Sequence, residues 1–182
     1  MEFRPLRLPG TFEIRSTPHQ DERGYFMRVY DLGLFSEGHL TTAWLQENQC
    51  LSRRKGIIRG LHFQKPPYTE SKLVRVVTGA IFDVFVDLRR GSDTYGQWDA
   101  IELSSKTHNQ VYIPKGFAHG YCTLTHETLV LYKVDSIYNP AFEGGLIWND
   151  MTLNIAWPVS RPILSFKDKS LGSLADFKTP FN

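Results

Sequence analysis

Apolar and polar residues alternate over short runs along most of this chain, and turn residues separate the runs. Gly79, Gly91, Gly96 and Gly116 punctuate it at roughly the 8–12-residue spacing of a sandwich or barrel. A period of two residues is typical of strands that bury one face. The predicted strands are residues 11–15, 24–30, 56–64, 72–77, 80–89, 97–103, 109–114, 119–124 and 128–135.

Helical periodicity is weak and is confined to residues 31–38 and the segment after Asp168. No linker, repeat or low-complexity segment interrupts the pattern. We therefore predict an all-β fold, an antiparallel jelly roll that forms a sandwich or barrel with few short helices. Residues 1–182 are predicted to form one domain, with an N-terminal arm and a C-terminal segment that packs on the jelly roll.

Composition narrows the function classes. Hydrophobic residues are 41% of the 182 residues, which is enough for a core, and a net charge of +2 gives no nucleic-acid footprint. The N-terminus lacks the apolar segment of a secretion signal, and no stretch approaches the ~20 apolar residues of a membrane span. Cys50 and Cys122 form no disulfide or metal pattern. We expect a cytoplasmic protein.

The strand at 56–64 holds two polar side chains in an apolar run. Strict alternation puts Arg59 and His62 on opposite faces, unless Gly60 marks a bulge that re-aims one of them. A core histidine with a satisfied hydrogen bond and a rim arginine would be an ordinary structural explanation. Because a small barrel can hold a ligand, the pair favours a pocket instead.

Charged residues also interrupt the apolar hairpin at 72–89. Asp83 and Asp87 share a face by alternation, and a buried carboxylate needs a partner. Lys72, Arg75 or His62 could supply it for Asp83. For Asp87 the alternative is a charge on an edge strand that discourages aggregation.

The stretch "IPKGFAHGY" contains Pro-x-Gly-x-x-His, the second half of the cupin signature. Cupin metal sites also need His-x-His and a Glu earlier in the chain, but His62 is followed by Gln64 at the second position. The sequence therefore predicts a cupin-like jelly roll without a metal. His119 is interpreted as an anion or substrate contact.

Eight stretches together resemble the dTDP-4-dehydrorhamnose 3,5-epimerase family. They are "DERGYFM", "IIRGLHFQKPP", "KLVRVV", "IFDVFVDLR", "IPKGFAHGY", "YKVD", "IWND" and "ILSFKD", in that order from about Asp21 to Asp168. The resemblance implies a jelly roll without metal or cofactor, usually homodimeric, that epimerises nucleotide-linked 4-keto-6-deoxy sugars. Such sugars serve deoxysugar biosynthesis, as for O-antigen or other cell-surface polysaccharides.

The resemblance also implies residue roles. His62 matches the catalytic base, Asp168 its carboxylate partner, Tyr132 the proton donor, and Lys72 the residue beside the ketone oxygen. A C4 ketone acidifies the hydrogens on C3 and C5, and histidine has an unperturbed pKa of ~6.5 that suits their removal. The remaining matches are implied contacts to nucleotide or sugar, with Arg59 and His119 suited to phosphate oxygens and Tyr138 to stacking on the base: Arg23, Arg28, Gln46, Asn48, Arg59, His119, Tyr138, Glu143 and Lys167.

One departure from the family pattern bears on the substrate. Arg28 stands where the family usually has a Glu suited to the N–H of thymine, whereas a guanidinium suits the ring acceptor of cytosine. The alternatives are therefore a 3,5-epimerase of a dTDP sugar, a mono-epimerase of a CDP sugar, and a non-catalytic sugar-nucleotide-binding cupin. A complete set of His62, Lys72, Tyr132 and Asp168 argues against the last, because binding alone needs no base and acid.

Overall fold

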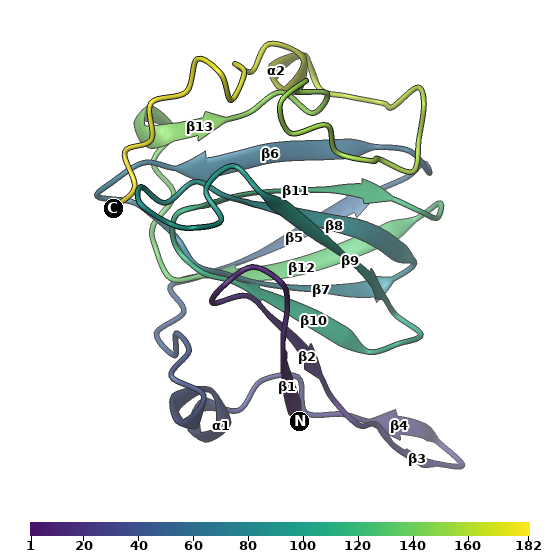
Figure 1. Ribbon diagram of the computed structural model, residues 1–182. Coiled ribbons are helices and arrows are strands. Elements are labelled where there is room, and N and C mark those ends of the chain that lie inside the picture. Colours follow the sequence, from purple (N-terminus) through teal and green to yellow (C-terminus); the bar gives the residue numbers. More distant parts are fainter.

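Two antiparallel sheets pack face to face in this computed structural model, which describes residues 1–182 (Figure 1). One sheet has the order β1 (Glu2–Pro5), β2 (Phe12–Arg15), β10 (Asn109–Ile113), β7 (Lys72–Thr78), β12 (Thr128–Val134) and β5 (Gln46–Ser52). The other has the order β13 (Glu143–Gly145), β6 (Ile58–Gln64), β11 (Phe117–Thr123), β8 (Ala80–Asp87) and β9 (Trp98–Ser104). This confirms the predicted all-β jelly roll.

The apolar core has two layers because the five-stranded sheet is covered on both faces. In β8, Ile81 and Phe85 face the six-stranded sheet, while Val84 and Val86 face the C-terminal segment. That segment runs across the outer face of the sheet and ends with the buried Phe181 (Figure 1). A strand buried on both faces reads as a nearly continuous apolar run, which is the pattern of residues 80–89.

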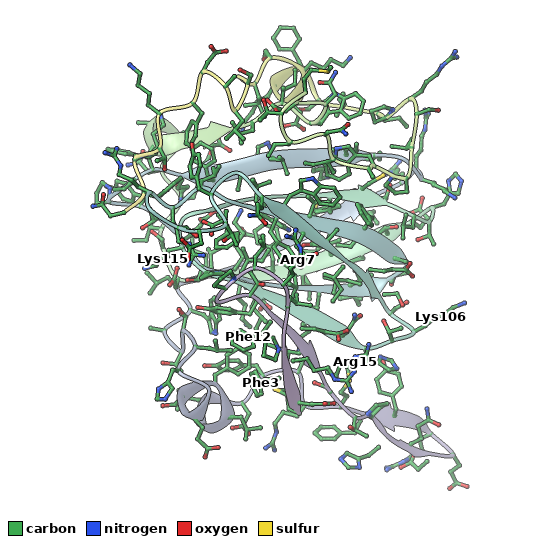
Figure 2. All side chains as sticks on the ribbon, in the orientation of Figure 1. Phe3, Arg7, Phe12, Arg15, Lys106 and Lys115 are labelled. Atoms are coloured by element: carbon green, nitrogen blue, oxygen red, sulfur yellow. The ribbon has the colours of Figure 1, made fainter.

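The N-terminal region forms a smaller cluster and a projecting hairpin. Helix α1 (Leu32–Glu37) buries Phe35 beside Ile14, and Phe3 and Phe12 join them from β1 and β2 (Figure 2). Strands β3 (His19–Asp21) and β4 (Gly24–Phe26) pair only with each other and extend away from the sheets (Figure 1). The predicted strand at 24–30 is therefore too long, because no third strand pairs with its second half.

The helices are short. The helix predicted at 31–38 is confirmed as α1, and Asp31 caps it by accepting a hydrogen bond from the Leu34 amide. The helix predicted after Asp168 instead forms α2 (Phe166–Lys169), because Ser165 caps it by accepting from the Asp168 amide. A 3₁₀ turn, η1, covers Pro140–Phe142. None of the helices has the length and apolar character needed to cross a membrane.

Strands β1, β3, β5 and β13 were not predicted, and β5 shows why. Its sequence, "QENQCLS", carries polar residues on both faces, so it has no hydrophobic alternation. The strand is instead held by its full pairing with β12, in which Asn48 lies opposite Tyr132. Tertiary pairing thus overrides a weak local preference.

Asp87 is not an edge charge, so that interpretation was wrong. Strand β8 lies between β11 and β9, and the Asp87 side chain is 0% exposed. Its carboxylate accepts hydrogen bonds from Arg89, Ser92 and Thr94. The shortest hydrogen bond from each of these residues is 2.7 Å long. Burial would raise the pKa of this carboxyl, but these donors outweigh it and lower the pKa to about 2. Asp87 therefore organises the connection between β8 and β9.

Candidate active site

A bulge in β6 brings two polar side chains to the same face. His62 pairs with His119 and Arg59 pairs with Tyr121, so two residues of β6, Gly60 and Leu61, lie opposite one residue of β11. Gly60 permits this with a φ of +118°, and a Cβ there would lie 2.6 Å from the Gly120 Cα. The predicted bulge is thereby confirmed, and Arg59 and His62 line one cavity.

His62 forms a dyad with a buried carboxylate from the other end of the chain. Its Nε2 lies 2.6 Å from Asp168 Oδ1, and the Asp168 side chain is 5% exposed. Burial alone would raise the pKa of Asp168, but hydrogen bonding and charge from His62 outweigh it and lower the pKa. The carboxylate therefore stays ionised and holds the Nε2–H, which leaves Nδ1 as the ring nitrogen that can accept a proton.

A second histidine–carboxylate pair lies beside the first. His119 Nε2 is 2.9 Å from Asp83 Oδ2, and the two side chains are 9% and 0% exposed. The partner of Asp83 is therefore His119 and not Lys72, Arg75 or His62, as the sequence had suggested. His119 lies directly opposite His62 in the β6–β11 pairing, so both imidazoles face the same space.

Lys72 and Tyr132 add an ammonium group and a phenol. Lys72 Nζ lies 3.2 Å from Glu70 Oε1, and Gln64 Nε2 donates to the other Glu70 oxygen at 2.9 Å. Tyr132 is half-buried on β12. Burial raises the pKa of Tyr132, as do the nearby Cys50 and Glu70, so the phenol stays protonated and can give up a proton.

Two hollows meet at His62, Lys72 and Tyr132. The first has a cavity volume of about 320 Å³ and the second of about 410 Å³. The other residues that line the first hollow are Cys50, Arg59, His119, Tyr121, Ser165, Lys167 and Asp168. The other residues that line the second are Gln46, Asn48, Phe63, Gln64, Glu70, Val134, Tyr138 and Glu143.

Polar contacts tie the rim of the second hollow together. Tyr138 Oη donates to Glu143 Oε2 at 3.0 Å, and the Tyr138 amide donates to Gln46 Oε1 at 3.0 Å. Lys167 from α2 forms an ion pair with the other Glu143 oxygen. Burial would raise the pKa of Glu143, but the Lys167 and Tyr138 contacts outweigh it and lower the pKa. Four predicted contact residues therefore form one network.

Arg23 and Arg28 do not reach this pocket within one chain. Arg23 lies on the projecting hairpin, is 85% exposed and pairs with Asp21 at 2.6 Å. Arg28 follows the hairpin, is 66% exposed and pairs with Asp31 at 2.9 Å. Neither side chain lines the two hollows. The other predicted site residues all do.

Several residues that line the pocket were not predicted from the sequence. Tyr121 lies two positions after His119 in β11, and Cys50 two positions after Asn48 in β5, so same-face spacing was the available signal. Glu70 and Ser165 lie in connections and gave no such signal. No group of three or more His, Cys, Asp and Glu side chains converges as metal ligands would.

Three comparisons relate this chain to known proteins. The family model described as dTDP-4-dehydrorhamnose 3,5-epimerase matches residues 5–176. A dTDP-4-dehydrorhamnose 3,5-epimerase from Methanothermobacter thermautotrophicus is 42% identical over 174 residues, which cover 93% of each chain. A dTDP-4-dehydrorhamnose 3-epimerase from Streptomyces niveus is 36% identical and covers 97% of this chain and 85% of its own.

Solved structures show the same likeness. The crystal structure of a dTDP-4-dehydrorhamnose 3,5-epimerase from Bacillus anthracis, with TDP and pyrophosphate bound, superposes with a TM-score of 0.93. It is 42% identical and covers 95% of this chain and 99% of its own. In the present chain, an imidazole, a phenol and an ammonium group, from His62, Tyr132 and Lys72, lie at the junction of the two hollows. Such a set of groups can take a proton from a carbon acid and return it.

Proposed function

The chain belongs to the dTDP-4-dehydrorhamnose 3,5-epimerase family, and we propose that its pocket epimerises a nucleotide-linked 4-keto-6-deoxyhexose at C3, C5 or both. The protein is thus an isomerase of the class that acts on sugar nucleotides. The observation that carries the site assignment is the dyad of His62 and Asp168, 2.6 Å apart, at the junction that Lys72 and Tyr132 complete.

The proposed reaction proceeds through an enolate. His62 Nδ1 removes the proton on the carbon next to the ketone. The electron pair of that C–H bond forms a C=C bond, and the π pair of the C=O bond moves to the ketone oxygen. Asp168 stabilises the imidazolium that results, and Lys72 stabilises the oxyanion. The oxyanion then re-forms the C=O bond, and the C=C pair takes a proton from Tyr132 on the opposite face of the carbon, which inverts its configuration. This half of the cycle leaves Tyr132 as phenolate and His62 as imidazolium, and proton exchange with solvent restores both.

The two hollows suggest how the substrate lies. Tyr138 is 53% exposed at the rim of the second hollow, where an aromatic ring can stack on a base. Since the ketone must meet Lys72 at the junction, we assign the nucleotide to the second hollow and the far end of the sugar to the first. Arg59 and His119, which were matched to phosphate oxygens from the sequence, then face sugar oxygens instead, because both line only the first hollow. The diphosphate lies nearer the rim.

Incubation with dTDP-4-keto-6-deoxyglucose in D₂O tests the function. We expect deuterium at C3, C5 or both and an epimerised product, both detected by NMR. Deuterium and inversion at C3 alone would identify a mono-epimerase. A protein that binds the sugar nucleotide but incorporates no deuterium would be a non-catalytic binding cupin, and the proposal would be wrong.

The active form is proposed to be a homodimer. Tyr25 and Phe26 on the projecting hairpin are 58% and 68% exposed, and Leu51 and Val77 on the six-stranded sheet are 48% and 40% exposed. Apolar side chains exposed this widely are typical of a surface that another chain covers. A partner seated there would let Arg23 and Arg28 reach its pocket.

A CDP-linked sugar is the second candidate substrate, and Arg28 favours it. A guanidinium donates only, so it suits the ring acceptor of cytosine and not the N–H of thymine. Its exposed position and its single ion pair, with Asp31, leave it able to turn toward a ligand of the partner. Calorimetric titration should show tighter CDP than dTDP binding, with Arg28→Glu reversing the order. Equal affinities, or an unchanged order in the variant, would exclude this candidate.

A further inference from the structure

The hydroxyl of Tyr121 is a buried polar group without a protein partner. Tyr121 is 5% exposed, and its ring belongs to the core between the sheets, yet nothing in the protein hydrogen-bonds its Oη. Cys50 and Ser52 on β5 lie near it but do not reach hydrogen-bond geometry. Folded proteins pair nearly all buried hydroxyls, because an unpaired one costs stability. This hydroxyl therefore calls for a functional explanation.

The position of Tyr121 in the pocket supplies a functional explanation for its unpaired hydroxyl. It lines the first hollow together with Arg59 and His119, and the bulge in β6 puts it directly opposite Arg59. Its spacing of two residues from His119 turns both side chains to the same face of β11. The proposed substrate orientation puts the far end of the sugar in this hollow, away from Tyr138.

The chemistry of the group fits a sugar hydroxyl. Burial raises the pKa of Tyr121 well above its usual value, and the nearby Cys50 raises it further, so the phenol remains neutral. A neutral phenol both donates and accepts, as a hexose hydroxyl does. A phosphate oxygen accepts only and is better matched by a cation.

We infer that Tyr121 is a specificity residue whose hydroxyl hydrogen-bonds a hydroxyl of the hexose. This inference rests on the proposed function, since it needs the sugar in the first hollow. It assigns to Tyr121 a part in recognising the sugar and none in proton transfer, which stays with His62 and Tyr132.

The test compares Tyr121→Phe with wild type for two probes. One is dTDP, and the other is dTDP-6-deoxyglucose, which lacks the ketone and so cannot react. Calorimetry should show that the variant binds dTDP-6-deoxyglucose roughly tenfold more weakly, because a buried hydrogen bond is lost. Its affinity for dTDP should stay within about twofold, since that probe has no hexose to contact.

Tyr112→Phe is the matched control. Tyr112 is a buried tyrosine on β10 whose Oη lies 3.2 Å from Thr41 Oγ1, outside both hollows. It should bind both probes as wild type does. The unliganded Tyr121→Phe protein should melt at or above the wild-type temperature, because it loses an unpaired hydroxyl, whereas Tyr112→Phe should melt lower.

Two results would overturn the inference while leaving the proposed function in place. One is wild-type affinity of Tyr121→Phe for dTDP-6-deoxyglucose. The other is an equal loss for both probes, which would mean that Tyr121 acts through the diphosphate or the shape of the pocket. Wild-type protein that binds neither these probes nor their CDP counterparts would instead overturn the proposed function itself.

Discussion

His62 is the residue on which the proposed chemistry depends most. His62→Ala should reduce deuterium incorporation at the sugar carbons by ~10²–10⁴, the usual loss when a general base is removed. Binding of dTDP should remain, because His62 lies at the junction of the two hollows, whereas the nucleotide base is assigned to the rim of the second hollow at Tyr138. NMR measures the first quantity and calorimetry the second. His126→Ala, an exposed histidine outside both hollows, is the control. Wild-type exchange in His62→Ala would remove this residue from the mechanism.

Tyr132 is assigned the opposite half of the reaction, so its loss should have a different signature. Tyr132→Phe keeps the base, and His62 can return a solvent-exchanged proton to the face from which it took one. We expect deuterium in recovered substrate, with epimer formation reduced by roughly 10² or more. NMR of the C3 and C5 positions distinguishes deuterium incorporation into the substrate from formation of the epimer. A variant that forms epimer at the wild-type rate would show that the proton donor is another group.

At the scale of elements, the connection between β8 and β9 depends on one buried carboxylate. The pKa of Asp87 is lowered from 3.8 to about 2, so it binds fewer protons in the folded protein than in the unfolded chain near pH 3. Its stabilisation, about 2 kcal/mol, is complete above about pH 4 and is lost as pH falls through about pH 2.

Asp87→Asn should therefore lower the free energy of unfolding at pH 7 by about 2 kcal/mol, and the difference from wild type should shrink below about pH 4. Urea denaturation at several pH values measures this. Asp93→Asn changes an exposed carboxylate in the same connection and should have little effect. A difference that stays constant down to pH 2 would contradict the ionic explanation.

At the scale of the whole molecule, the proposed homodimer would explain why Arg23 lies on the projecting hairpin, outside both hollows of its own chain. Sedimentation analysis of the active protein should give twice the 21.0 kDa mass of the chain. Arg23→Ala and His62→Ala should each be inactive alone. When the two variants are mixed, half of the dimers hold one intact site, so about a quarter of the activity should return.

The recovered activity shows whether Arg23 serves the pocket of its own chain or that of the partner. If Arg23 served its own pocket, each mixed dimer would carry one defect in either site and no activity would return. The controls are the two variants assayed separately at the same total protein concentration, and wild type mixed with His62→Ala. A monomeric mass at active concentrations would contradict the proposed dimer directly.

The sequence by itself determined the fold class and most of the residues in the pocket. Alternation of apolar residues marks strands, because a strand exposes its two faces in turn, and Arg59 and His62 stand out because polar groups are costly in such runs. Prediction from alternation failed for β5, because this strand carries polar residues on both faces.

Only the tertiary structure decided how those residues meet. Gly60 and Gly120 approach closely enough to bulge β6, which turns Arg59 and His62 to one face. Asp168, the partner of His62, comes from α2, and Asp83, the partner of His119, comes from β8, so both partners are distant in the chain. The lack of a partner for the Tyr121 hydroxyl also depends on packing. Local patterns encode the face on which a side chain lies, whereas its neighbours depend on how the sheets pack together.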